Sequence, residues 1–267
     1  MIHPTALIDP KAQLGAHVEV GAYSIIGPEV ALGDHCRVLS HCVLEGRVIA
    51  GDHNFFGTGC VIGSPPQDFA FDPASPSSVR IGSHNTFREY VTIHRGTKPG
   101  SETVVGNHCY LMANSHLGHN VCLGSRVVMA NAALLGGYAE VADGAVLGGG
   151  ALVHQFTKIG RLAMLRGGGR VSKDVPPFCF ADDKNILCGI NSLGLRRAGI
   201  SPPVRLEIRS AYHLIFLSGL NISQALEKAS QQVWGSEARE FFEFIKSSKR
   251  GVCRAASRRQ DEDFVEG

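Results

Sequence analysis

Three residues, His119, Gly137 and Gln155, are each separated by 18 positions along the 267-residue chain. If successive 18-residue coils stack, neighbouring members of this set lie about 4.8 Å apart in one column. A histidine in such a column can act as a general base, and a glycine N–H can donate to a tetrahedral oxyanion. His116 lies three residues before His119, and His154 directly precedes Gln155, so both belong to the same candidate site.

A structural role for these histidines is the competing interpretation. The chain contains 12 histidines, and His35, His53, His84 and His108 follow short glycine-containing turn sequences. A solvated residue at a corner of the chain explains those four better than catalysis does. From residue types alone, both roles therefore remain open for His119.

The elements that would position the column follow from a six-residue repeat. Counted in sixes from Ile2 to Ile62 and again from Ile81 to Val171, 26 of 27 positions are apolar, and Pro99 is the exception. Only 44% of the chain is apolar, so chance does not explain the pattern. Glycine often follows the apolar residue, where it relieves strain at a corner. Six is the period of neither a helix nor a simple strand, and it suits a short strand followed by a turn.

This repeat resembles that of left-handed parallel β-helices, in which three hexapeptides form one triangular coil of about 18 residues. The resemblance implies a mainly β fold, a solenoid over residues 1–177, with residues 64–80 extruded as a loop that contains four prolines. A C-terminal α-helical domain is expected over residues 178–254, with helices at 201–217, 222–233 and 236–249. Residues 255–267 are charged and are expected to be a disordered tail.

Composition restricts the classes of function. The net charge is only +2, so no binding to nucleic acid is expected. No basic segment precedes an apolar one at the N-terminus, and no run of about 18 apolar residues exists. We therefore expect a cytoplasmic protein without stable membrane insertion. The eight cysteines show no CxxC spacing and are expected to be mostly buried thiols.

Seven segments occur in an order that resembles a known family: QDFAF (67–71), IHRGT (93–97), NSHLGHN (114–120), LLGG (134–137), VHQF (153–156), KDVPP (173–177) and NSLGLRRAG (191–199). The chain resembles the acyl-[acyl-carrier-protein]–UDP-N-acetylglucosamine O-acyltransferases, which begin lipid A synthesis. The similarity covers residue 1 to about Arg254. It implies transfer of a 3-hydroxy fatty acyl group from acyl carrier protein to the 3-position of UDP-N-acetylglucosamine.

The resemblance also implies roles for individual residues. His119 becomes the general base, and the Gly137 N–H becomes the oxyanion donor. The sugar nucleotide is expected to be bound by residues from the solenoid, the extruded loop and the helical tail, namely Asp68, His116, His154, Gln155, Asn191 and Arg197. Gly167 matches the position that limits acyl length, although Arg166 and Arg170 beside it replace the usual small residues.

Partners follow from the same resemblance. The enzyme is expected to need no resident cofactor or metal, because the phosphopantetheine arm arrives with the acyl carrier protein. A homotrimer with active sites between subunits is expected. Eight basic residues could attract the acidic carrier protein, or could equally be solvated helix surface: Arg196, Arg197, Arg205, Arg209, Lys246, Lys249, Arg250 and Arg254.

One departure from the family bears directly on catalysis. Asn120 stands where the family usually has an Asp, and an amide cannot stabilise an imidazolium by charge. Loss of such a carboxylate costs on the order of 10⁴ in rate in a triad enzyme. Other replacements lie in the expected sugar-nucleotide environment, namely Ala70 for Lys, Tyr138 for His, Leu193 for Glu and Ala198 for Arg.

These departures keep further hypotheses open. The acceptor can carry a 3-amino group, which is a better nucleophile than an alcohol, or the chain can be a catalytically weakened sugar-nucleotide-binding paralogue. A further alternative is an N-acyltransferase that acts on the 2-amino sugar of the same pathway. That enzyme usually has an additional N-terminal domain, whereas the repeat here begins at Ile2. A γ-class carbonic anhydrase would need three histidines on one zinc ion. The quoted motifs argue against the last hypothesis.

Overall fold

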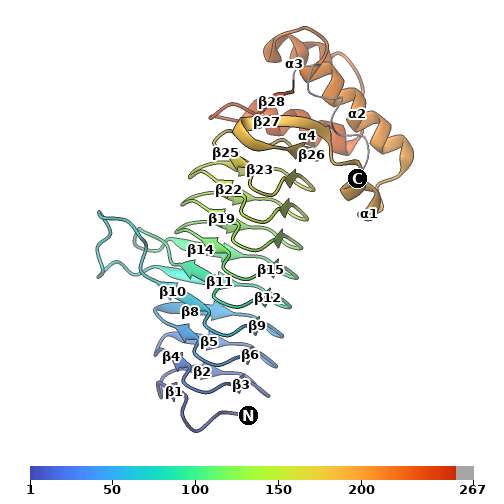
Figure 1. Ribbon diagram of the computed structural model, residues 1–267. Coiled ribbons are helices and arrows are strands. Elements are labelled where there is room, and N and C mark those ends of the chain that lie inside the picture. The colour runs from blue at the N-terminus through green and yellow to red at the C-terminus, as the bar shows by residue number, and fades with distance from the viewer. Residues whose placement is uncertain (257–267) are drawn as a thin grey trace.

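The computed structural model describes residues 1–256, which form a left-handed parallel β-helix followed by a group of helices at its C-terminal end (Figure 1). This is the fold class that the six-residue repeat predicts. Consecutive strands belong to three different sheets, and each strand pairs in parallel with a strand from the next coil. The three sheets form the faces of a prism whose interior is the core.

The strands are short, and most consist of two residues. The nine-stranded sheet contains β1 (Leu7–Ile8), β4 (Ile25–Ile26), β7 (Val43–Leu44), β10 (Val61–Ser64), β13 (Thr92–His94), β16 (His116–Leu117), β19 (Leu134–Leu135), β22 (Leu152–Val153) and β25 (Arg170–Val171). The eight-stranded sheet contains β2 (Gln13–Leu14), β5 (Val30–Leu32), β8 (Arg47–Ala50), β11 (Ser78–Ile81), β14 (Glu102–Val105), β17 (Cys122–Leu123), β20 (Glu140–Val141) and β23 (Lys158–Ile159). The eleven-stranded sheet contains β3 (Glu19–Val20), β6 (Arg37–Val38), β9 (Phe55–Phe56), β12 (Thr86–Phe87), β15 (Tyr110–Leu111), β18 (Val128–Met129), β21 (Val146–Leu147), β24 (Met164–Leu165), β26 (Cys179–Ala181), β27 (Ile186–Ile190) and β28 (Arg254–Ala255).

Strand register confirms the 18-residue coil. His116 pairs with Leu134, Leu134 pairs with Leu152, and Leu152 pairs with Arg170. From Val20 onward, each apolar position of the hexapeptide register, apart from Pro99, is buried. Stacked coils therefore bury one continuous apolar core, and each coil satisfies backbone groups of its neighbours.

A second internal row holds small residues two positions before the apolar one. Cys36, Cys42, Cys60 and Cys109 occupy this row, and the Cys42 and Cys109 thiols each donate to a carbonyl oxygen of the following coil at 3.0 Å. Six of the eight cysteines are buried, as the sequence predicts. These thiols serve packing at the corners of the prism.

Exposed histidines form a ladder along one corner. His17, His35, His53, His84 and His108 have positive φ angles, and their rings stack at 4.8–4.9 Å between centroids. The prediction that such histidines are solvated corner residues is confirmed for His35, His53, His84 and His108. The ladder lies outside the groove that is described below.

Two insertions leave the coil, and the sequence predicted only one. The first comprises residues 65–77, so the predicted range of 64–80 is too long: Ser64 belongs to β10, and residues 78–80 belong to β11, which pairs with both β8 and β14. The second comprises residues 95–101, between β13 and β14. It carries Pro99, which is exposed and therefore is not a register position of the core. Figure 1 shows the extruded chain projecting from the middle of the solenoid.

The C-terminal region starts with β26 and β27, an antiparallel pair separated by the 3₁₀ helix η1 (Asp183–Asn185). Four α-helices follow: α1 (Ser192–Arg197), α2 (Pro202–Phe216), α3 (Ile222–Ser230) and α4 (Ser236–Ser247). Helices α2, α3 and α4 lie within the three predicted ranges, and α1 was not predicted. No helix in the described part of the chain is long and apolar enough to span a bilayer.

The predicted disordered tail begins too early. Ala255 ends β28, which pairs with β27, and the Ala256 N–H donates to Leu187 O. Residues 257–267, the rest of that predicted tail, lie outside the described residues. Across the domain junction, Arg161 of the solenoid pairs with Glu240 of α4 at 2.7 Å and lies 4.9 Å from the Phe178 ring centroid. This contact joins the helices to the last coils.

Candidate active site

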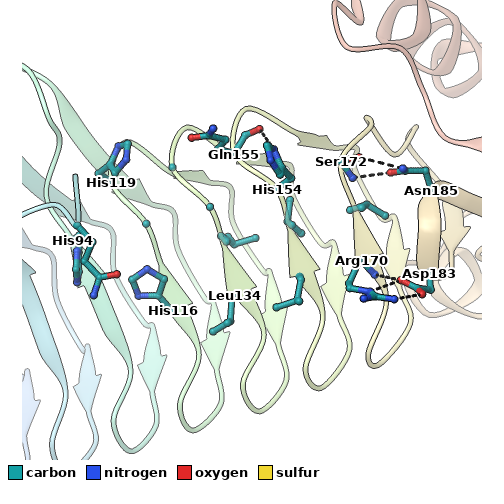
Figure 2. A pocket seen from close by; sticks show the side chains of 18 of the residues that line it. His94, His116, His119, Leu134, His154, Gln155, Arg170, Ser172, Asp183 and Asn185 are labelled. Carbon is teal, nitrogen blue, oxygen red and sulfur yellow. Dashed lines mark hydrogen bonds and ion pairs between the residues drawn. The ribbon is translucent and has the colours of Figure 1, made fainter. Parts of the chain in front are cut away.

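A groove of about 720 Å³ runs along the outer face of the nine-stranded sheet, from β13 to β25. Its floor includes Leu134 and Leu152, which point outward and are 38% and 39% exposed. In Figure 2, His119, Gln155 and His154 follow one edge of the groove, while Arg170, Ser172, Asp183 and Asn185 close one end. A partly apolar floor with polar groups at its edges suits a ligand that is itself part apolar and part polar.

The structure brings the predicted column together. His119, Gly137 and Gln155 occupy the same corner position in successive coils, and all three line the groove. His116 and His154 line it as well. The stacking of coils therefore turns a spacing of 18 residues into one local site.

His119 lies directly over Gly137. A Cβ atom on Gly137 would be only 2.5 Å from His119 Nε2, so any side chain there would displace the imidazole. The φ angle of Gly137 is not in the left-handed region, which means that space, rather than backbone conformation, requires a glycine here. The histidine is half-buried, and its Nε2 has no hydrogen-bond partner within residues 1–256.

The Gly137 N–H is available to a ligand. The neighbouring Gly136 N–H donates to Val153 O at 2.9 Å, and the Tyr138 N–H donates to His119 O at 2.9 Å. The Gly137 N–H, by contrast, donates to no acceptor in the part of the chain that the structure describes. Gly118 keeps it accessible, since a Cβ on Gly118 would lie 2.9 Å from this nitrogen. An unpaired N–H beside a histidine suits stabilisation of an oxyanion.

Asn120 holds the other ring nitrogen of His119. The Asn120 Oδ1 atom lies 3.1 Å from His119 Nδ1, and it also accepts from the N–H and the hydroxyl of Thr97, each at 3.0 Å. The ring of Tyr138 contacts His119 edge-on, with 5.3 Å between centroids. Asn120 thus occupies an orienting position beside His119.

Two further histidines are held uncharged by their surroundings. Burial, with smaller contributions from the nearby His94 and His119, lowers the pKa of His116 to about 4. Burial also lowers the pKa of His94, with a smaller contribution from His119. The His94 and His116 rings meet edge-on at 5.0 Å, and the Thr92 hydroxyl lies 2.7 Å from His116 Nδ1. Near neutral pH, His116 therefore acts as a neutral hydrogen-bonding group.

The end of the groove near β25 carries an ion pair. Arg170 binds Asp183 through two hydrogen bonds of 2.9 and 2.8 Å, and the Arg170 guanidinium lowers the pKa of the Asp183 carboxyl. Beside it, Asn185 Oδ1 accepts from the N–H of Ser172 at 2.7 Å. Arg166, the other unusual arginine of the sequence, pairs with Asp182 at 2.9 Å. Both arginines that flank Gly167 are therefore balanced by carboxylates.

Five predicted site residues do not line this groove: Asn120, which contacts His119, and Asp68, Asn191, Arg197 and Gly167. Asp68 is exposed in the first insertion and accepts from Ala70 N at 2.9 Å, and Arg197 is exposed at the end of α1. Asn191 caps α1 through Gly194 N at 3.0 Å and donates to Leu162 O, which is a structural role in this chain. Gly167 follows β24, at a different corner from His119.

Sequence reasoning missed several residues of the groove. Gln67, which directly precedes Asp68, lines it, and so does the buried His94 of the quoted IHRGT segment. The presence of His94 in that segment was a usable signal. Arg170 was noted only as a neighbour of Gly167, and nothing in the spacing indicated its pairing with Asp183. Among residues 1–256, no group of three or more potential metal-binding side chains is found.

Comparisons with known proteins agree over most of the chain. A family described as UDP N-acetylglucosamine O-acyltransferase, domain 2, matches residues 174–253. The acyl-[acyl-carrier-protein]–UDP-N-acetylglucosamine O-acyltransferase of Halorhodospira halophila is 47% identical over 95% of this chain and 99% of its own length. The enzyme of the same name from Paraburkholderia phymatum is 46% identical, with the same coverage.

Solved structures show the same similarity. The crystal structure of LpxA, a UDP-N-acetylglucosamine acyltransferase from Bacteroides fragilis, has a TM-score of 0.91 and 36% identity, and covers 95% of this chain and 100% of its own. The enzyme from Campylobacter jejuni has a TM-score of 0.90 and 29% identity, covering 95% and 99% of the two chains.

The left-handed β-helix, with a histidine above an unpaired glycine N–H, defines a hexapeptide-repeat acyltransferase. Within that class, the chain belongs to the family of acyl-[acyl-carrier-protein]–UDP-N-acetylglucosamine O-acyltransferases. This membership favours acyl transfer over the γ-class carbonic anhydrase that the fold alone permitted.

Proposed function

We propose that the protein transfers a 3-hydroxy fatty acyl group from acyl carrier protein to the 3-hydroxyl of UDP-N-acetylglucosamine, as the first step of lipid A biosynthesis. Family membership over 95% of the chain supports the substrates. One observation carries the chemistry: the unpartnered Nε2 of His119 lies over Gly137, whose N–H is also free of acceptors within the described residues.

The proposed reaction uses these two groups in sequence. His119 Nε2 takes the proton of the sugar hydroxyl as the oxygen attacks the thioester carbonyl. The Gly137 N–H then donates to the oxyanion of the tetrahedral intermediate. When the intermediate collapses, the C–S bond breaks, and the imidazolium returns the proton to the leaving thiolate. The products are the sugar ester and the free thiol of the carrier protein, so no resident cofactor or metal enters this scheme.

Substitution of His119 tests the assignment. His119→Gln should lower kcat by about 10²- to 10⁴-fold, the range that a general base contributes. His108→Gln is the matched control, because His108 is also a corner histidine with an exposed ring but lies outside the groove. Binding of UDP-N-acetylglucosamine to His119→Gln, followed by calorimetry, should be retained. Near-wild-type turnover in His119→Gln would rule out the proposed role.

A homotrimer with shared active sites is part of the proposal. Arg197 and Gly167, which the family resemblance assigns to the site, do not line the groove of their own chain, and this supports sites completed by a neighbouring subunit. Mixing inactive His119→Gln and Arg197→Ala subunits should then restore activity. In a cyclic trimer assembled at random from equal amounts, about a quarter of all sites would carry both native residues. If verified mixed trimers recover no activity, His119 and Arg197 of each active site come from the same chain.

Docking of the acidic carrier protein is assigned to the basic C-terminal region. None of the eight basic residues of the C-terminal region that the sequence singled out forms an ion pair with a carboxylate in residues 1–256. Arg250 donates to Ser172 O at 3.0 Å, and the charges of the other seven support an interaction with an acidic partner. The KM for acyl carrier protein should rise steeply with salt, whereas the KM for the UDP-sugar should change less. A cytoplasmic location belongs to the proposal, and the buried thiols suit a reducing compartment.

The 3-amino analogue of UDP-N-acetylglucosamine is the second candidate acceptor, favoured by Asn120. The Asn120 amide binds His119 but lacks the charge of the usual Asp, and an amine nucleophile needs a weaker base than an alcohol does. Assays with both UDP-sugars, with mass spectrometry of the ester or amide product, separate the two. Faster turnover of the hydroxyl substrate would reject the amine. Binding of either sugar without acyl transfer would instead identify a weakened paralogue.

A further inference from the structure

Three donors converge on a single oxygen atom of Asn120. The Thr97 N–H and the Thr97 hydroxyl each donate to Asn120 Oδ1 at 3.0 Å, and His119 Nδ1 lies 3.1 Å from the same atom. A fourth group extends the network, because the Tyr138 hydroxyl lies 2.8 Å from Thr97 Oγ1. These contacts connect the side chains of Tyr138, Thr97, Asn120 and His119 in one network.

The direction of each hydrogen bond follows from the Thr97 N–H. A backbone N–H can only donate, so the Asn120 atom that faces it is the amide oxygen and not the NH₂ group. Because that oxygen can only accept, His119 Nδ1 must carry the proton that lies between them. The single hydroxyl proton of Thr97 also points to Asn120, so the Tyr138 hydroxyl must donate to Thr97. The result is one directed network that ends at Asn120 Oδ1.

The main chain of Asn120 is held as firmly as its side chain. Asn120 has a left-handed backbone with a φ of 60°, and its N–H donates to the buried Thr103 hydroxyl at 2.8 Å. Thr97 lies in the second insertion, and Thr103 lies in β14 directly after it. The insertion therefore supports the corner that presents His119.

Tyr138 is itself immobilised. Its ring stacks on Phe156 of the next coil, with 4.9 Å between centroids and 12° between planes, and contacts His119 edge-on. Stacking fixes the phenol oxygen beside Thr97, so the hydroxyl needs little reordering to donate. This tyrosine replaces the usual histidine of the family, and its hydroxyl donates to Thr97 Oγ1 because the Thr97 proton is already directed to Asn120.

We propose that Thr97 and Tyr138 are positioning residues that orient the Asn120 amide and thereby fix His119 as the Nδ1–H tautomer. With Nδ1 protonated, the lone pair of Nε2 faces the space above Gly137, where a general base needs it. The network supplies by geometry the tautomer control that an Asp supplies by charge. The inference rests on the proposed function, since it explains how His119 is kept ready to accept a proton.

Nitrogen NMR tests the tautomer without any assay of activity. The full-length protein is labelled with ¹⁵N-histidine, and the His119 signals are identified by their loss in His119→Gln. At pH 8.5 the wild-type spectrum should show Nδ1 protonated and Nε2 bare. In Thr97→Val, which removes the hydroxyl, and in Tyr138→Phe, the Thr97 N–H still donates to Asn120 Oδ1, so each variant should add a minor population of the Nε2–H tautomer to the wild-type signal. Thr97→Ser, which keeps the hydroxyl, should restore the wild-type spectrum.

Kinetics provide the second readout. Thr97→Val and Tyr138→Phe should each lower kcat by about 3- to 10-fold, the range for one lost hydrogen bond, with little change in the KM for the UDP-sugar. The effects should not multiply in the double variant, because both act through Asn120. Tyr23→Phe is the matched control, since Tyr23 also occupies a left-handed corner and stacks on the next coil, far from the groove.

The outcomes separate this inference from the proposed function. A bare Nδ1 on His119 in the wild type, or an unchanged tautomer in both Thr97→Val and Tyr138→Phe, would overturn the inference even if His119→Gln is inactive. An active His119→Gln would instead overturn the proposed function, whatever tautomer is found.

Discussion

The imidazole of His119 covers the Cα atom of Gly137, one coil further along the solenoid. A Cβ atom at position 137 would meet Nε2 at 2.5 Å, which is closer than real Cβ contacts allow. The absence of a side chain at Gly137 thus leaves room for the imidazole, and the Gly137 N–H itself has no acceptor within residues 1–256.

Gly137→Ala should therefore lower kcat by about 10²-fold or more, the effect of losing an aligned oxyanion donor together with a displaced base. Folding should be little affected, because the obstacle is the side chain of a half-buried histidine and the φ angle of Gly137 is ordinary. Turnover and thermal unfolding of the same preparation check both parts.

Gly27→Ala is the control for this substitution, because Gly27 lies outside the groove. Its added Cβ would meet Leu44 O at 3.3 Å, a tight contact that a small local shift relieves. Its turnover should match that of the wild type. Equal activity of Gly137→Ala and Gly27→Ala would show that the space above Gly137 is not the reaction site.

The repeat predicted the main site because a solenoid converts sequence spacing directly into distance. His119, Gly137 and Gln155 are close for the same reason that His116, Leu134 and Leu152 pair in register. The fold was equally predictable, since each hexapeptide places one apolar residue in the core.

The second insertion escaped that reasoning for a specific reason. Ile81 pairs with Val105, and the insertion of residues 95–101 between them leaves the six-residue period unchanged. In the sequence, Pro99 therefore resembled one irregular position within a regular coil. The contacts from Thr97 to Asn120 were therefore not predictable. Loop residues such as Gln67 are likewise placed by loop conformation, which has no period. Helix α1 was missed because six residues with a glycine at position 194 give little periodic signal.

Restoring the usual carboxylate tests the cost of Asn120. In Asn120→Asp, the N–H and hydroxyl of Thr97 and the ring of His119 would all face a carboxylate oxygen, for which they are suitable donors. The charge would stabilise the imidazolium that forms during the reaction. Turnover of the 3-hydroxy sugar should rise by at least about 10-fold, since the reverse change costs on the order of 10⁴ in a triad enzyme.

Asn114→Asp is the control, because Asn114 also has a left-handed backbone, with a φ of 61°, and lies outside the groove. Rates with both UDP-sugars should be compared. If Asn120→Asp accelerates neither sugar, charge at this position does not limit the enzyme.

The depressed pKa of His116 predicts a loss of stability in mild acid. The unfolded chain binds a proton at this ring below about pH 6.5, whereas the folded chain does not until about pH 4. The folded state therefore loses stability as the pH falls through this window and gains none from this group above it. His116→Gln should show a smaller loss between pH 6.5 and 4, measured by denaturant midpoints.

Thr92→Val separates titration of His116 from its hydrogen bond. This variant loses the 2.7 Å contact with His116 Nδ1 but keeps the ring, so its pH dependence should persist. Identical pH profiles of wild type and His116→Gln would mean that His116 titrates alike in the folded and unfolded chains.

Gly167 provides the test of acyl-chain length. A Cβ on this residue would lie 3.3 Å from Gly149 O, a tight contact that a small local shift relieves, and the rest of a longer side chain would project from an exposed corner. If a neighbouring subunit closes that corner, as the proposed trimer requires, Gly167→Met fills the space that the end of the acyl chain would occupy. The preferred donor should become shorter by several carbons, and each buried CH₂ that is excluded should cost about 0.8 kcal/mol. Gly167→Ala, which adds only the Cβ, should change the preference little.

Competition between acyl carrier proteins that carry acyl chains of different length, with mass spectrometry of the products, measures the shift. The KM for the UDP-sugar should be the same in Gly167→Met and Gly167→Ala. An unchanged product distribution in Gly167→Met would show that the acyl chain ends elsewhere.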